Sequence, residues 1–194
     1  MRKITLVIAA ALMGLVVTSC GPSKEAILTE VSAFFTKAQT DIQAIDNADA
    51  LKEFVTTFGD KKNEFMATLS EKFAMKDNNF VGFSEEENTE IMGKIADLET
   101  EYNTVKTAKC GEILKPYIDR YHNVVAAMQE KANNQEAFPV EMLDEMKASS
   151  EDIKKYSDIV PEELATIFNA DDQLATTLLS DTLVAPAAPA APAK

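Results

Sequence analysis

The single histidine of the sequence, His122, stands three residues after Asp119. Aspartate and histidine at this spacing share one face of a helix, so the pair could supply two ligands to a metal ion. Di-iron carboxylate bundles need Glu-x-x-His on two helices, and this sequence holds no second copy of such a motif. We therefore predict no metal site, and we expect His122 to be a surface residue beside the apolar face of its helix.

Other patterns that carry chemistry are absent from the sequence. It has no glycine-rich phosphate loop, no Gly-x-Ser-x-Gly, no His-Glu-x-x-His and no Cys-x-x-Cys-His for covalent haem. Residues 46–49 and 169–172 suggest calcium-binding turns, but they lack the spacing and the glycine of an EF-hand, so helix capping explains them more simply. The sequence thus predicts no catalytic residue, no metal and no cofactor.

The amino-terminal segment has the order of charges and apolar residues that is typical of a signal peptide. Arg2 and Lys3 are followed by an apolar or small run over residues 4–17. That run of 14 residues is shorter than the roughly 20 that a membrane-spanning helix needs. The run leads into Val17-Thr18-Ser19-Cys20.

Val17-Thr18-Ser19-Cys20 resembles the lipobox of bacterial lipoproteins. The resemblance implies that Cys20 receives a diacylglyceryl group, that residues 1–19 are removed, and that the new amino terminus is acylated, with palmitate as a typical chain. A plain secretory signal and a short membrane anchor are the alternatives. Gly21 is not the aspartate that retains enterobacterial lipoproteins in the inner membrane, which favours the outer membrane. Whether the protein faces the periplasm or the cell surface stays open.

The charge limits the classes of partner. Removal of residues 1–19 takes away two basic residues, so the formal charge changes from −13 to −15. Such an acidic chain offers no basic face to nucleic acid, and its folded surface has no attraction for anionic lipid. We therefore predict that the acyl chains alone hold the protein at the membrane. We interpret the excess of acid as a means of solubility rather than as a cation-binding site.

Cys110 is the only cysteine left once Cys20 carries lipid, so the chain cannot form an internal disulfide. We expect Cys110 to be buried as a small hydrophobic residue; a disulfide between two molecules is the alternative.

Apolar residues that recur every three or four positions predict an all-α domain over residues 24–183, an antiparallel up-and-down bundle of five to seven helices. Residues 20–23 then form the lipidated cysteine and a short tether. Cys110-Gly111 is expected to cap one helix and Pro116 to begin the next. The expected helices run over about 24–46, 48–75, 85–111, 116–132, 140–156, 162–168 and 172–179.

Two segments are expected to lie outside the helices. Residues 76–83 form a loop in which Phe80, Val81 and Phe83 cover the end of the core. Ser149-Ser150-Glu151-Asp152 is a possible second helix start that would divide the helix opened by Pro139. Residues 184–194, VAPAAPAAPAK, predict a disordered tail of polyproline II character; docking of this tail on an envelope partner is the alternative.

These features favour a non-enzymatic binding or scaffold lipoprotein that engages another envelope protein. A carrier of a small apolar ligand is the first alternative, and an enzyme that uses only carboxylates is the second. The wide apolar faces also favour a compact monomer about 35 Å long, with a radius of gyration of about 16 Å, over an extended coiled-coil dimer. A carrier would need a cavity among five residues of the expected core: Phe35, Phe58, Tyr102, Tyr121 and Met128.

Overall fold

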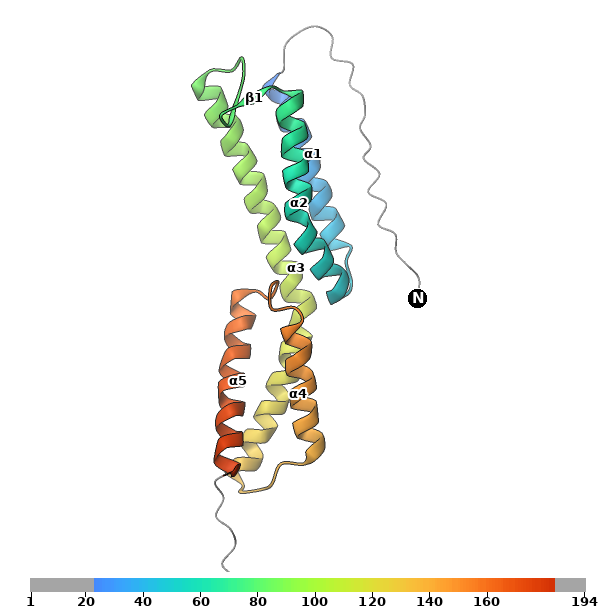
Figure 1. Cartoon of the computed structure of the whole chain (residues 1–194), viewed down its shortest axis with the longest axis vertical. Coiled ribbons are helices and arrows are strands. Elements are labelled where there is room, and N and C mark those ends of the chain that lie inside the picture. Colours follow the sequence, from blue (N-terminus) through green and yellow to red (C-terminus); the bar gives the residue numbers. More distant parts are fainter. Residues whose placement is uncertain (1–22, 184–194) are drawn as a thin grey trace, which may run out of the picture.

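A computed structural model describes residues 23–183, which form an all-α protein with one small β-hairpin (Figure 1). Consecutive helices run antiparallel to one another, which confirms the predicted helical bundle. Cys20, the signal segment and residues 184–194 lie outside the described residues. The elements in chain order are α1 Lys24–Gln43, α2 Ala48–Lys72, β1 Met75–Lys76, β2 Asn79–Phe80, α3 Glu85–Asn133, α4 Val140–Lys154 and α5 Glu162–Leu183.

The first three helices each begin at a side chain that caps the helix. Ser23 Oγ accepts a hydrogen bond from the Ala26 backbone N–H at 3.2 Å, and Asn47 Oδ1 accepts one from Ala50 at 2.9 Å. At the start of α3, Ser84 and Glu87 form a capping box, in which each side chain accepts a hydrogen bond from the backbone of the other residue. The hydrogen bonds that the Glu87 carboxylate accepts from Ser84 hold the pKa of Glu87 below its usual value. Local sequence therefore determines these helix starts.

Helix α3 continues through the predicted break at residues 110–116. It is one helix of 49 residues with Pro116 inside it, and Gly111 does not adopt a positive φ. The expectation that Cys110-Gly111 ends a helix and that Pro116 begins another is therefore wrong. Proline removes one backbone hydrogen bond, but Leu114 and Ile118 on its two sides are both 1% exposed, and this burial holds the helix together across the defect.

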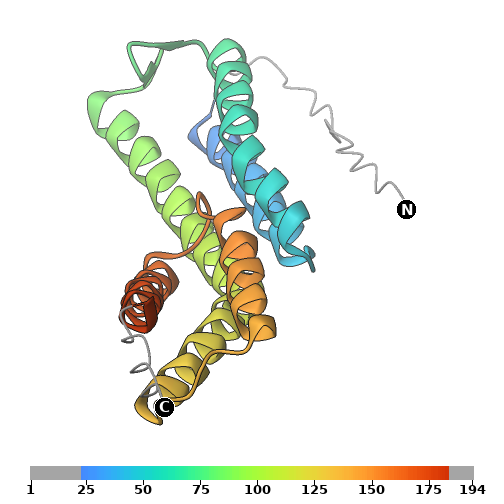
Figure 2. The same ribbon diagram turned by 60° about the horizontal axis from the view of Figure 1, so that its bottom comes forward.

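The described helices form two bundles in series along α3 (Figure 2). We call α1, α2 and residues 85–114 of α3 the first bundle, and α4, α5 and residues 118–133 of α3 the second bundle. Each has its own hydrophobic core, and the green and yellow parts of α3 in Figure 2 run in different directions. A proline between two cores is a common cause of such a bend. At 1.5 Å per residue, α3 follows a path of about 74 Å, so the expected compact body about 35 Å long is wrong.

Helices α4 and α5 also pass through predicted breaks. Ser149 and Ser150 are buried inside α4, where Ser149 Oγ donates to the Glu145 carbonyl at 2.6 Å and begins no new helix. Residues 169–172 lie in the middle of α5. Asp171 and Asp172 therefore do not cap a final short helix, because their carboxylates interact with side chains of α3 instead.

Residues 75–80 form a two-stranded hairpin where the sequence predicts a loop. Asp77 and Asn78 take φ values of 51° and 63°, the left-handed conformation that a tight hairpin turn requires. The Asn88 side chain, 5% exposed, accepts from the Phe80 N–H at 2.7 Å and donates to the Phe80 carbonyl at 3.2 Å. Phe80 covers the core as predicted, whereas Val81 is 55% exposed and does not.

The connection between α4 and α5 joins the two bundles. Tyr156 Oη donates to Asp49 Oδ1 of α2 at 2.8 Å, and Lys52 Nζ lies 3.0 Å from Asp158 Oδ1. Tyr156 and Ile159 are buried in the core of the first bundle. The bend in α3 is therefore braced by a second, independent link between the bundles.

Candidate interaction surfaces

The predicted lipid attachment residue, Cys20, lies outside the described residues, whereas Cys110 lies inside the first core. Cys110 is 3% exposed and is a free thiol, and burial raises its pKa. The prediction of a buried thiol is confirmed, although it sits within α3 and not at a helix end. A protonated, enclosed thiol is unsuited to nucleophilic chemistry.

His122 is exposed, as predicted, but its partner is not the aspartate that the sequence suggests. His122 Nδ1 lies 3.0 Å from Asp171 Oδ2 of α5, while Asp119 pairs with Lys115 at 2.5 Å. Residues 23–183 contain no group of three His, Cys, Asp or Glu side chains that could hold a metal ion. The His122–Asp171 contact thus joins α3 to α5, and only a tertiary structure could reveal it.

Tyr121 makes a second contact between the same helices. Its hydroxyl donates to Asp172 Oδ1 at 3.0 Å, and the ring is 1% exposed. Burial first, and the bond to Asp172 second, raise the pKa of Tyr121 above its usual range. The four side chains of these two contacts therefore hold α5 against α3 in a structural role.

The five residues proposed to line a ligand cavity do not meet. Phe35, Phe58 and Tyr102 pack together in the first core, with the rings of Phe58 and Tyr102 stacked at a centroid distance of 4.0 Å. Tyr121 and Met128 belong to the second core. The carrier alternative would need one cavity among all five, and these described residues cannot share one, because they belong to two separate cores.

Tyr102 presents one polar atom without a partner. Its ring is 1% exposed, and its buried hydroxyl forms no hydrogen bond with any described residue. Burial raises the pKa of Tyr102 above its usual range. Since the hydroxyl lies within a packed aromatic cluster, it is a cost in stability rather than part of a site.

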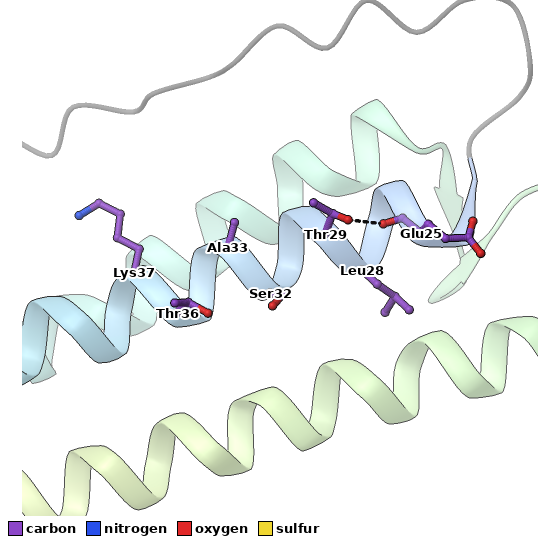
Figure 3. A pocket seen from close by; sticks show the side chains of 7 residues that line it. All are labelled: Glu25, Leu28, Thr29, Ser32, Ala33, Thr36 and Lys37. Atoms are coloured by element: carbon purple, nitrogen blue, oxygen red, sulfur yellow. Dashed lines mark hydrogen bonds between the residues drawn. The ribbon is translucent and has the colours of Figure 1, made fainter.

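An open hollow follows the outer face of α1 (Figure 3). Short side chains dominate this face, and the Thr29 hydroxyl donates to the backbone carbonyl of Glu25 at 2.6 Å. No acid, base and nucleophile converge there. The hollow is a shallow surface on one helix, lined by Glu25, Leu28, Thr29, Ser32, Ala33, Thr36 and Lys37.

A second hollow lies between two helices of the second bundle, and we call it the α3–α4 notch. Val124, Ala127 and Met142 form its apolar lining, and all three are half-buried. Asn123, Glu141 and Glu145 complete the lining. Two helices thus contribute to an apolar surface bordered by carboxylates.

Arg120 fixes one border of the notch. Its Nε donates to Glu145 Oε1 at 2.6 Å, and its Nη1 donates to Asp152 Oδ2 at 3.2 Å. The bond to Glu145 raises the pKa of Arg120 and lowers that of the Glu145 carboxyl. Arg120 therefore ties α3 to α4 beside the notch and fixes the orientation of the Glu145 carboxylate.

The net negative charge per residue is higher in the part of the chain that forms the second bundle. Residues 117–183 contain 14 acidic and 5 basic side chains, a net charge of −9 over 67 residues. Residues 23–116 contain 18 acidic and 11 basic side chains, a net charge of −7 over 94 residues. The charge density is therefore higher on the bundle that contains the notch.

None of the helices within residues 23–183 is long and apolar enough to cross a membrane. Comparison with protein-family models, with curated proteins and with solved structures found no match.

Proposed function

We propose that this protein is an exported lipoprotein of the bacterial cell envelope, anchored through Cys20 in the outer membrane, that acts as a non-enzymatic binding scaffold. The apolar segment over residues 4–17 and the lipobox-like residues that end at Cys20 support the anchor. The acidic surface supports attachment by acyl chains rather than by charge.

The observation that carries the scaffold role is the arrangement of the two bundles along α3. Helix α1 begins at Lys24, four residues after Cys20, at the end of the first bundle that is remote from the second (Figure 1). With the anchor there, α3 holds the second bundle away from the membrane by tens of ångströms, since its path is about 74 Å. A protein that presents a surface at a fixed distance needs no cofactor or enclosed cavity.

The anchor requires more than one acyl chain. Each buried methylene contributes about 0.8 kcal/mol, so a single chain holds a protein only transiently, whereas two or three chains hold it stably. The diacylglyceryl group on Cys20 and the acylated amino terminus, which the lipobox resemblance implies, together supply enough acyl chains. The folded surface then need not touch the lipid for the protein to stay in place.

Replacement of Cys20 by alanine tests the anchor in growing cells. We expect Cys20→Ala to abolish labelling by a palmitate analogue and to leave a precursor that is not cut before residue 20. Cys110→Ala is the matched control, because the other cysteine is buried and free, and labelling should persist in it. A lipid-labelled, membrane-bound Cys20→Ala protein would overturn the proposal.

Cross-linking in intact cells tests the binding role. We expect mass spectrometry to find a discrete set of envelope proteins joined to the second bundle of the wild-type protein. The same set should be lost from Cys20→Ala, since the unanchored chain is no longer held at the membrane. Identical adducts in both would show that the anchor does not position the bundle.

A further inference from the structure

The α3–α4 notch is placed for contact with another molecule. Val124 and Ala127 lie within the last ten residues of α3, and Met142 lies in the first turn of α4. The notch is therefore close to the loop between these helices, at the end of the second bundle far from α1 (Figure 1). In the proposed function this end faces away from the membrane.

Ala127 has the smallest side chain in the lining of the notch. Its side chain is a single methyl group, whereas Val124 and Met142 beside it are larger and pack against the second core. Val140, in the same turn of α4 as Met142, adds an apolar side chain that is 67% exposed. This shape suits one apolar side chain from a helix that lies across α3 and α4, the way an amphipathic helix docks in a groove.

The border of the notch sets the charge of its occupant. Glu141 and Glu145 flank the apolar lining, and Glu145 shares Arg120 with Asp152. Glu141 and Asp144 form no ion pair with any residue of the described chain. With a net charge of −9 over residues 117–183, the surface around the notch favours a cationic partner and repels an acidic one.

We infer that the α3–α4 notch binds a basic amphipathic helix of a partner protein, with an apolar side chain seated over Ala127 and basic side chains facing Glu141 and Glu145. This inference deepens the proposed scaffold role and rests on it for the biological setting. Its chemistry is independent of the anchor, so the two can fail separately.

A designed peptide tests the notch in solution. The protein is the chain from residue 20 with Cys20→Ser, which contains every described helix and carries no lipid. The probe is a fluorescent amphipathic helix built only of leucine and lysine, and its counterpart has glutamate in place of each lysine. We expect the basic peptide to bind with an affinity that falls as salt rises, and the acidic peptide to bind at least about tenfold more weakly.

Two variants that differ by one position locate the site. Ala127→Arg fills the notch and adds a positive charge, and it should weaken binding of the basic peptide by about tenfold or more. Ala126→Arg adds the same charge at an exposed neighbouring position of α3, and it should change the affinity by less than about twofold. Circular dichroism of both variants checks that their helices remain folded.

A milder variant keeps the test decisive if Ala127→Arg fails to fold. Glu141→Gln removes one exposed carboxylate from the border and should weaken binding by about threefold. Three results would each overturn the inference. They are equal affinity of Ala127→Arg and Ala126→Arg for the basic peptide, unchanged affinity of Glu141→Gln, and binding of the acidic peptide as tightly as the basic one. A failure of lipid labelling at Cys20 would instead overturn the anchor and leave this result unaffected.

Discussion

At the scale of single residues, the buried hydroxyl of Tyr102 is the clearest imperfection in the first core. It has no hydrogen-bond partner among the described residues, although its ring stacks on Phe58. A buried polar group without a partner costs about 1–3 kcal/mol. We expect Tyr102→Phe to raise the free energy of unfolding by about 1 kcal/mol, measured by urea denaturation.

Tyr121→Phe is the matched control for that change. It removes the same atom from an equally buried ring, but this hydroxyl donates to Asp172. The free energy of unfolding of this control should therefore fall by about 1 kcal/mol. Destabilisation of both variants by the same amount would show that the Tyr102 hydroxyl has a partner after all.

Three buried tyrosines predict sensitivity to alkali. Burial, aided by Asp49 in Tyr156 and by Asp172 in Tyr121, raises the pKa of Tyr102, Tyr121 and Tyr156. In the unfolded chain these hydroxyl groups lose their protons at about pH 10, while the folded chain retains them. Folding is therefore disfavoured as the pH rises above that value, by up to about 1.4 kcal/mol per pH unit for each tyrosine.

Tyr156→Phe separates this effect from the general titration of lysines. We expect the variant to be less stable than the wild type at pH about 8, because it loses the bond to Asp49. Between about pH 10 and 11 its stability should decline less steeply, since one linked proton has been removed. Urea titrations measure this difference. If the free energies of unfolding of the variant and the wild type declined equally steeply over this pH range, the raised pKa of Tyr156 would not be the cause of the alkali sensitivity.

At the scale of elements, Asn88 organises the hairpin that closes the first bundle. Its side chain interacts with the backbone of Phe80 and donates to the carbonyls of Phe83 and Ser84 at 3.3 and 3.1 Å. An aspartate or serine could not supply the same set of donors and acceptors. The sequence offers only an asparagine in the first turn of α3, which is why its role was missed.

We expect Asn88→Ala to lower the free energy of unfolding by about 2–4 kcal/mol, because it leaves buried backbone groups of the hairpin without partners. Thr89→Ala is the control, since Thr89 is exposed and its hydroxyl binds only the Glu85 carbonyl of its own helix. It should change stability by less than about 0.5 kcal/mol in the same urea titration. Equal losses would show that the hairpin does not depend on Asn88.

At the scale of the whole molecule, the serial bundles predict an elongated monomer. A straight rod as long as the α3 path of about 74 Å would have a radius of gyration of about 21 Å. The bend in α3 lowers this value, but we expect it to stay above the value of about 16 Å for a compact domain of this size. Small-angle scattering of the chain from residue 20 with Cys20→Ser measures this difference, and light scattering gives the mass. A monomer with a radius of gyration of about 16 Å would contradict the serial arrangement.

The sequence alone determined the fold class and the positions of several helix ends. Apolar residues with a helical period identify all five described helices, and Ser23, Asn47, Ser84 and Pro161 each stand where a helix begins. These signals are local, because a cap or a periodic apolar face depends on residues within a few positions of one another. The exposure of His122 follows from the same periodicity, whereas the burial of Cys110 was expected from the chemistry of an unpaired thiol.

The tertiary structure decided where helices do not end and which side chains meet. Pro116 and Asp171-Asp172 are local stop or start signals, yet helices α3 and α5 continue through them. Burial of Leu114 and Ile118 outweighs the loss of one backbone hydrogen bond at the proline, and the aspartates find partners on α3. Such long-range contacts are invisible to periodicity, so the division into two cores, and with it the α3–α4 notch, appears only when the chain is folded.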